Sequence, residues 1–188
     1  MGREERRILV LASGNAGKLR ELGALLRREG FDLRPQSEWG IPEASEDGLS
    51  FIENALLKAR HAASRCGHPA VADDSGLVVP ALGGQPGIYS ARYAGPNSSD
   101  ADNNAKLLHA MDALEGDQRR AYFYCAMALA RDGADPIPLV ATASWPGSIL
   151  REARGDGGFG YDPLFLVEKH GCSSAELPAA TKNRVSHR

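Results

Sequence analysis

The chain has 188 residues, of which 43% are hydrophobic and 24% are charged, and its formal net charge is −2. These values are typical of one globular domain with a real core, and the lack of a basic block argues against tight binding to nucleic acid. Three widely spaced cysteines form neither a disulfide framework nor a zinc-ligand spacing. No apolar run approaches the roughly 20 residues of a membrane span, and the charged start leads into a strand rather than a signal peptide. We therefore expect a cytoplasmic protein that binds neither nucleic acid nor membrane.

The chain opens with a predicted strand, a loop and a helix. Residues 7–12 form a short apolar run that is typical of a buried strand, and residues 13–17 interrupt it. Leucines between Leu19 and Leu26 then recur at helical spacing, and Gly30 is the residue expected to end this helix. A second strand is expected over residues 31–34.

The next predicted helix follows an acidic loop. Ser50 and Glu53 have the spacing of a capping box, so we expect a helix that starts there and ends at Gly67. A brief apolar strand over residues 70–72 follows. We expect residues 73–76, Asp-Asp-Ser-Gly, to end it, because these residue types favour turns.

The second half of the chain is rich in predicted strands. A Gly/Pro-rich loop covers residues 83–95, and Ser99 can cap a helix that we expect to end at Gly116. Further strands are expected over residues 120–131, 139–145, 149–152 and 164–167. Helices and strands that alternate early and give way to strands later imply an α/β fold with a mixed sheet.

One candidate phosphate loop lies between the first strand and the first helix. It consists of Ser13, Gly14, Asn15, Ala16, Gly17 and Lys18. Amides at a helix start and the helix dipole favour an anion, the small residues permit close approach, and Ser13, Asn15 and Lys18 add side-chain donors. The segment lacks the glycine and Ser/Thr positions of a Walker A loop. The alternative is an ordinary strand-to-helix connection with a solvated lysine.

An acidic pair, Asp73 and Asp74, directly follows a predicted strand. Adjacent side chains in extended backbone point to opposite sides, so one of the pair is expected to face a ligand. Mg²⁺ needs hard oxygen ligands, and one aspartate with Glu46 from the acidic loop would supply them. A carboxylate beside the metal can also take a proton from water. The alternative is a turn, and Lys58 alone reads as an exposed helical lysine.

A glycine- and aromatic-rich loop covers residues 157–163. It can stack a base and bond its edge, or it can be a hairpin whose Phe and Tyr pack in the core. The chain end carries the donors Lys182, His187 and Arg188, which alone read as a solvated terminus.

Together these segments resemble one family. The matching blocks are Ser13-x-Asn15-x-x-Lys18, Ser50-Phe51-x-Glu53-Asn54-Ala55-x-x-Lys58-Ala59, Asp73-Asp74-Ser75-Gly76-Leu77, Pro86-Gly87-x-Tyr89-Ser90-Ala91-Arg92-Tyr93, Gly157-Gly158-Phe159-Gly160-Tyr161-Asp162-Pro163 and Ser186-His187-Arg188. In this order and spacing they resemble the inosine/xanthosine triphosphate pyrophosphatases, house-cleaning enzymes for non-standard purine nucleotides. The resemblance runs from Ile8 to Arg188.

The resemblance implies a single domain over residues 1–188, with two lobes around a long mixed sheet, flanking helices and an active-site cleft between the lobes. It also implies a homodimer that releases pyrophosphate from ITP, dITP or XTP with Mg²⁺. Asp74 would be the general base, and Glu46 and Asp74 would bind the metal. Substrate would be bound by Ser13, Gly14, Asn15, Ala16, Gly17, Lys18, Lys58, Ser75, Phe159, Gly160, Tyr161, Asp162, Lys182, His187 and Arg188.

The end of the chain departs from the family's pattern. Members usually continue past the Ser-His-Arg block into a final helix, so we expect such a segment to be missing after Arg188 or to have been lost. Donors from His187 or Arg188 would suit the O6 acceptor of hypoxanthine and xanthine but not the amino group of adenine. The alternatives are a Maf-like nucleotide pyrophosphatase of other base preference and a non-catalytic nucleotide-binding module.

Overall fold

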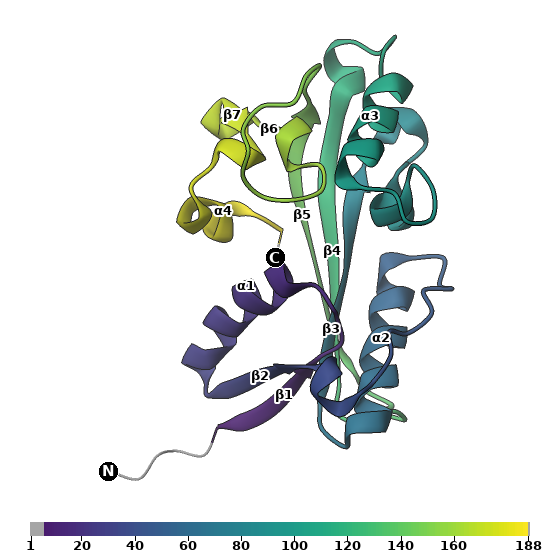
Figure 1. The fold of residues 1–188 in the computed structure, drawn as a ribbon, viewed down its shortest axis with the longest axis vertical. Coiled ribbons are helices and arrows are strands. Elements are labelled where there is room, and N and C mark those ends of the chain that lie inside the picture. Colours follow the sequence, from purple (N-terminus) through teal and green to yellow (C-terminus); the bar gives the residue numbers. More distant parts are fainter. Residues whose placement is uncertain (1–5, 188) are drawn as a thin grey trace. The chain divides into compact units, whose positions relative to one another are not determined.

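The computed structural model describes residues 6–187, without the side chains of Ala16 and Glu21. The strands are β1 (Arg7–Leu11), β2 (Phe31–Pro35), β3 (Ala70–Val78), β4 (Arg120–Ala130), β5 (Leu139–Ile149), β6 (Phe165–Val167) and β7 (Cys172–Ser173). The α-helices are α1 (Ala16–Leu26), α2 (Phe51–Cys66), α3 (Asp100–Ala110) and α4 (Ala179–Val185). Figure 1 shows their course along the chain.

The strands form one seven-stranded sheet in the order β2-β1-β3-β4-β5-β6-β7. The sheet is mixed, because β1 pairs in parallel with β2 and β3, whereas β6 pairs antiparallel with β5 and β7. The predicted α/β fold with a mixed sheet is therefore confirmed. Among the helices of residues 6–187, none combines the length and the apolar character needed to cross a membrane.

The chain divides into two compact units. Unit 1 comprises Met1–Asp74 and Ala126–Thr142, and unit 2 comprises Ser75–Cys125 and Ala143–Arg188. The division falls inside three strands, so β3, β4 and β5 each contribute residues to both units. The expectation of one domain with two lobes stays a prediction.

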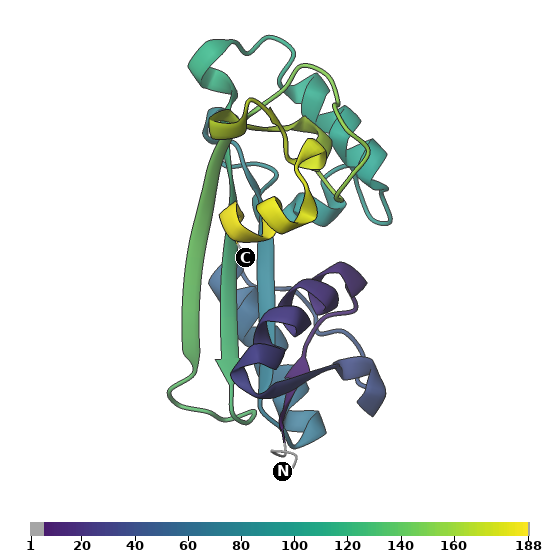
Figure 2. The ribbon, with the colours of Figure 1, turned by 90° about the vertical axis from the view of Figure 1, so that its left-hand side faces the viewer.

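Unit 1 is built on the parallel strands β1, β2 and β3. The apolar run of β1 is buried, and Leu9 and Leu11 pack with Leu22 of α1 and Val71 of β3. Figure 2 shows α1 beside β2. The predicted helix after the first loop is confirmed as α1, which ends at Leu26. A 3₁₀ turn over Arg27–Glu29 follows it, and Gly30 ends that turn in the left-handed conformation (φ 81°).

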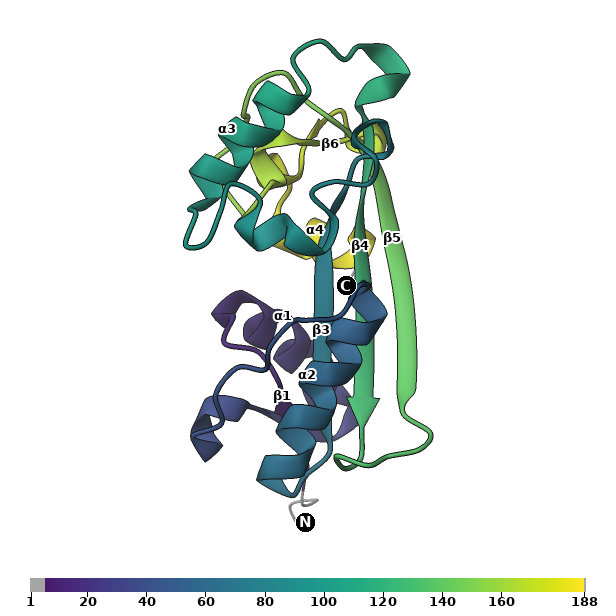
Figure 3. The same cartoon turned by 90° about the vertical axis from the view of Figure 1, so that its right-hand side faces the viewer.

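Helix α2 begins and ends as the sequence predicts. The Ser50 hydroxyl oxygen accepts a hydrogen bond from the Glu53 amide at 3.2 Å, and Gly67 ends the helix with a positive φ of 68°. One face of α2 carries small buried residues, Ala55, Ala59, Ala62 and Ala63. These residues let the helix pack closely in unit 1, where it lies beside β1 (Figure 3).

Unit 2 has its own apolar core. It gathers residues from β3, α3, β5, β6 and the loop before β6, with Leu107, Met111, Leu164 and Phe165 among its fully buried members. Helix α3 starts at a complete capping box in which the Ser99 hydroxyl accepts from the Asp102 amide and Asp102 accepts from the Ser99 amide. This confirms the predicted start of α3.

Predicted boundaries are wrong in strands β3 and β5. Strand β3 continues through residues 73–76 instead of ending in a turn, because both aspartates find lysine partners from the two sides of the strand. Strand β5 runs unbroken from Leu139 to Ile149, so no separate strand exists over residues 149–152. Strand β5 contains Pro146, and it pairs with β6 at Ser148 and Ile149, beyond the proline.

Other elements differ at their ends or were missed. Helix α3 ends at Ala110 rather than near Gly116, because Met111 leaves the helical conformation (φ −102°, ψ 6°). The two-residue strand β7 and helix α4 were not predicted, since neither has enough residues to show a period.

Candidate functional site

Strand β3 presents its two aspartates to opposite sides. The Oδ2 atom of Asp73 lies 2.9 Å from the Nζ atom of Lys18 in α1. The Oδ1 atom of Asp74 lies 2.8 Å from the Nζ atom of Lys58 in α2. The predicted alternation of the pair is confirmed, and each carboxylate is neutralised by a lysine from a different helix.

Lys58 also holds the carboxylate of the acidic loop. Its Nζ atom donates to Glu46 Oε1 and to Asp74 Oδ1, both at 2.8 Å, so the two predicted metal ligands meet at one ammonium group. Burial opposes the charge of Lys58, but Asp74 and Glu46 together raise its pKa. Burial raises the pKa of Asp74, and Lys58 offsets part of that effect.

Asn54 completes this arrangement and was missed as a site residue. It is fully buried, its Nδ2 atom donates to Asp74 Oδ2 at 3.3 Å, and its Oδ1 atom accepts from the Gly48 amide at 2.9 Å. Its position one turn before Lys58 places both side chains on one face of α2, and this spacing was the available signal.

The residues around Lys58 suit a hard cation. Glu46 and Asp74 already converge on one positive charge, and carboxylate oxygens are the ligands that Mg²⁺ prefers. Among the described residues no group of three or more His, Cys, Asp or Glu side chains is placed to hold a metal. A Mg²⁺ ion ordinarily takes one or two carboxylates and completes its shell with water and phosphate.

The candidate phosphate loop is ordered by its own side chains. Asn15 caps α1, and its Oδ1 atom accepts from the amides of Gly17 at 2.8 Å and Lys18 at 3.1 Å. The Ser13 hydroxyl oxygen accepts from the Asn15 amide at 3.1 Å. The amides that were expected to face an anion are thus hydrogen-bonded within the loop. The absence of a side chain at Gly14 leaves room for Glu43, because a Cβ atom at Gly14 would lie 2.7 Å from Glu43 Oε1.

In unit 2, Asp162 organises the aromatic loop. Its Oδ2 atom accepts from the Phe159 amide at 2.8 Å and from Lys182 Nζ, and its Oδ1 atom accepts from the Ser174 hydroxyl at 2.8 Å. Asp162 is buried, so both carboxylate oxygens are used inside the protein. Three of the predicted base-binding residues are therefore brought together, and Ser174 is a partner that the sequence did not reveal.

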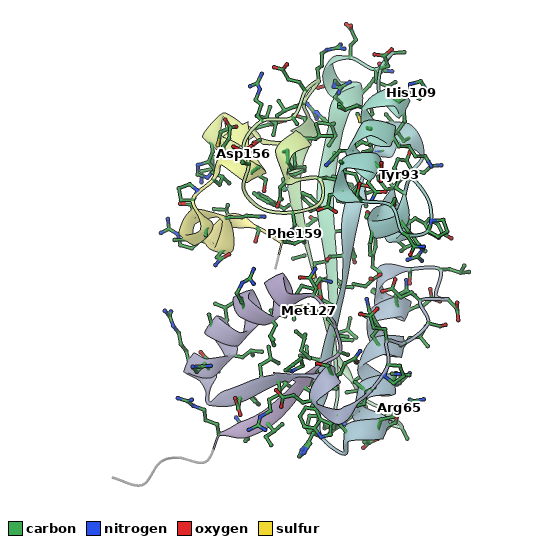
Figure 4. The ribbon with its side chains drawn as sticks, in the orientation of Figure 1. Arg65, Tyr93, His109, Met127, Asp156 and Phe159 are labelled. Atoms are coloured by element: carbon green, nitrogen blue, oxygen red, sulfur yellow. The ribbon has the colours of Figure 1, made fainter. Side chains whose placement is uncertain are left out.

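The two aromatic residues of this loop have different surroundings. Phe159 is 39% exposed on the loop that follows β5 (Figure 4), and Lys182 Nζ lies 5.2 Å from its ring centroid. Tyr161 is only 4% exposed, packs in the core of unit 2 and donates to the Ser90 carbonyl oxygen at 2.9 Å. The exposed ring of Phe159 can stack on a base, whereas the buried ring of Tyr161 anchors the loop in the core of unit 2.

The backbone of Gly160 is held at both ends. Its amide donates to Asp100 Oδ2 at 2.6 Å, and its carbonyl oxygen accepts from Asn104 Nδ2 at 2.9 Å. Both partners belong to α3 and are 56 and 60 residues away in the sequence, so no local pattern pointed to them.

The remaining predicted residues are His187 and Arg188 at the chain end and Ser75 in β3. The ring of His187 stacks on Phe123 at a centroid distance of 5.1 Å and an interplanar angle of 6°. Arg188 lies outside the described residues. Ser75 directly follows Asp74 within β3.

The fold and these contacts define an α/β protein whose lysine–carboxylate pairs suit a phosphate group and a hard cation. A family model described as the Ham1 family matches residues 9–188, so the chain belongs to the Ham1 family. This match decides against the Maf-like alternative.

Relatives match over nearly the whole chain. A Methylococcus capsulatus protein named dITP/XTP pyrophosphatase is 58% identical over 183 residues, which cover 97% of this chain and 91% of that protein. A Salmonella typhimurium protein with the same name is 54% identical over 180 residues, covering 96% and 91%.

Solved structures of Ham1 proteins share the fold. A HAM1 protein from Coxiella burnetii is 47% identical with a TM-score of 0.91, and the match covers 97% of this chain and 92% of that one. The Staphylococcus aureus Ham1 protein is 39% identical with a TM-score of 0.86 and the same coverage.

Proposed function

We propose that the protein hydrolyses non-standard purine nucleoside triphosphates, ITP, dITP and XTP, to the monophosphate and pyrophosphate. The observation that carries this proposal is the identity of 54–58%, over 96–97% of the chain, to proteins named dITP/XTP pyrophosphatase. The cluster of Lys58, Asp74 and Glu46 supports it, because hydrolysis of a triphosphate needs charge neutralisation and a base for water.

We assign Mg²⁺ as the cofactor, with Glu46 and Asp74 as its carboxylate ligands. When bound, the ion would offset the negative charge on the phosphate oxygens. Lys58 binds both carboxylates in the structure, so a metal ion would compete with its ammonium group for the same oxygens. A released Lys58 would be free to donate to the phosphates, which accords with its assigned role in substrate binding.

Asp74 is the general base in this proposal. It accepts a proton from water as the water oxygen forms a bond to the α-phosphorus, and the bond from that phosphorus to the α,β-bridging oxygen breaks. Pyrophosphate leaves with the bonding electron pair. Lys18, with Ser13, Gly14, Asn15, Ala16 and Gly17, would hold the triphosphate, and Ser75 would contact the substrate.

The base is assigned to unit 2. Phe159 would stack on the purine, Gly160, Tyr161 and Asp162 would contact the nucleoside, and Lys182, His187 and Arg188 would read the base edge. Donors opposite O6 would be left unmatched by adenine, at about 1–3 kcal/mol per buried group.

The substrate assignment is tested by pyrophosphate release. We expect kcat/KM for ITP, dITP and XTP to be at least about 10-fold higher than for ATP. One buried donor of the protein left without a partner by adenine would lower kcat/KM by about that factor. GTP belongs in the same series, since it also carries O6. Activity should vanish when Mg²⁺ is removed with EDTA and return when it is added back. Equal kcat/KM for all five nucleotides would contradict the base assignment, and ITP binding without pyrophosphate release would support the non-catalytic module.

The role of Asp74 is tested by Asp74→Asn. We expect kcat to fall by about 10²–10⁴-fold while ITP still binds, because the variant cannot take the proton from water. Asp135→Asn removes another buried carboxylate of unit 1 and serves as the matched control, with kcat retained at a temperature where it is folded. Near-normal turnover in Asp74→Asn would end the assignment.

We further propose a single-domain homodimer in the cytoplasm that binds neither nucleic acid nor membrane. Ile137 and Leu139 of unit 1 are 68% and 69% exposed and adjoin exposed Val140, an apolar patch that suits a subunit interface. The free cysteines accord with a reducing compartment. Light scattering should give twice the mass of 20.1 kDa.

A further inference from the structure

Two helices of the protein carry an asparagine at the same position. Asn54 is the fourth residue of α2 and Asn103 is the fourth residue of α3, and both side chains are buried. Each uses Oδ1 to accept a backbone amide from the segment before its helix: Gly48 N at 2.9 Å for Asn54 and Ala94 N at 2.7 Å for Asn103. Both therefore tie a loop to the first turn of a helix.

The two asparagines differ in what the amide nitrogen contacts. Nδ2 of Asn103 donates to the backbone carbonyl of Ala91 at 3.3 Å, a purely structural bond. Nδ2 of Asn54 donates at the same distance to the carboxylate of Asp74. Hydrogen bonding determines which way the side-chain amide of Asn54 points. The Gly48 amide can only donate, so it must face Oδ1 of Asn54, and Nδ2 is then left to donate to Asp74.

The backbone near Gly48 is fitted to this contact. A Cβ atom at Gly48 would lie 2.7 Å from Asn54 Oδ1 and 2.7 Å from the Cβ of Glu53. Only glycine allows the loop to approach Asn54 this closely. Glu46 lies two residues before Gly48, so the same hydrogen bond holds the loop that carries the second carboxylate.

We propose that Asn54 is a positioning residue that sets the geometry of the carboxylate pair Glu46 and Asp74. By donating to Oδ2 of Asp74 it leaves Oδ1 for Lys58, which also binds Glu46. By accepting from Gly48 it fixes the loop of Glu46 relative to α2. This inference rests on the proposed function, since it concerns the carboxylates assigned to Mg²⁺.

The test compares Asn54→Ala with Asn103→Ala. Both variants lose the buried hydrogen bond between a helix and the loop before it, so both should have a lower Tm. Only Asn54→Ala should weaken Mg²⁺ binding, by about 10-fold or more, as expected for a partner that orients a metal ligand. Mg²⁺ affinity is measured by titration calorimetry without nucleotide, and the Mg²⁺ concentration for half-maximal pyrophosphate release is measured separately.

Each result decides between the two proposals. A wild-type protein that cleaves ITP and binds Mg²⁺, together with an Asn54→Ala variant of unchanged Mg²⁺ affinity, overturns the positioning role alone. A wild-type protein that binds no Mg²⁺ overturns the metal assignment and the positioning role with it. An equal loss of Mg²⁺ affinity in Asn103→Ala also overturns the inference, because general destabilisation would then explain the effect.

A second variant keeps the test decisive if Asn54→Ala does not fold. Gly48→Ala leaves every side chain of the site intact and pushes the loop away from Asn54. We expect it to weaken Mg²⁺ binding about 3-fold or more, in the direction of Asn54→Ala. Unchanged affinity in folded Gly48→Ala would contradict the proposal.

Discussion

Two buried charges on adjacent residues dominate the chemistry of β3. Asp73 and Asp74 are both shielded from solvent, and each is neutralised by a lysine at 2.8–2.9 Å from a different helix. Removing one partner of such a pair leaves an uncompensated buried charge. The free-energy cost of that charge exceeds the free energy that the intact pair contributes to stability. The strand therefore depends on Lys18 and Lys58 to hold two buried carboxylates in place.

In unit 2, some groups are engaged within the protein, whereas others are available to a ligand. Asp162 has both oxygens occupied by Phe159, Ser174 and Lys182, so in the proposed function it would act on a base only through these partners. Phe159, in contrast, keeps 39% of its surface exposed. Within unit 2, the exposed ring and the lysine above it are the groups best placed to meet a ligand.

At the scale of elements, the turn between β4 and β5 depends on one carboxylate. Asp135 is buried and accepts hydrogen bonds from the amides of Arg131 and Ile137 and from the Arg131 guanidinium. Hydrogen bonds from Arg131 hold the pKa of Asp135 well below its ordinary value. A depressed pKa stabilises the fold above the unfolded-state value of about 3.9, and this contribution is lost as pH falls below it.

We therefore expect Asp135→Asn to lower Tm at pH 7 and at pH 5 by the same amount. The difference from wild type should narrow below about pH 4, where the wild-type carboxylate begins to lose its advantage. Thermal melts followed by circular dichroism at several pH values provide the measurement. Asp132→Asn, an exposed carboxylate with one amide partner in the same turn, is the control and should cost less. A Tm difference that widens in acid would refute this account.

Elements with local signals could be predicted from the sequence. Helices α1 and α2 are bounded by cap residues and glycines whose effect is local, and β1 is an apolar run, so all three were found. Residues 73–76 were wrongly predicted to form a turn from their residue types. Ion pairs of Asp73 and Asp74 with lysines of distant helices override the local preference of these residues for a turn. Contacts such as Asn104 with Gly160 join residues 56 apart, and no pattern in the sequence encodes them.

At the scale of the whole molecule, the two units are joined by shared strands rather than by a linker. The division passes through β3, β4 and β5, so neither unit is a continuous stretch of chain. Unfolding one unit would remove part of each of these strands from the sheet. We expect this continuity to make the two units unfold together in one cooperative transition.

The two tryptophans make that expectation testable. Trp39 belongs to unit 1, and Trp145 is buried in the core of unit 2 against Phe165. Trp145→Phe leaves Trp39 as the only tryptophan, and Trp39→Phe leaves Trp145. In each variant, denaturation followed by fluorescence should coincide with denaturation followed by far-UV circular dichroism, because one transition governs both. Comparison within each variant removes the effect of the substitution on stability. A fluorescence midpoint that precedes the circular dichroism midpoint in either variant would show that one unit unfolds first, and the shared strands would then not couple them.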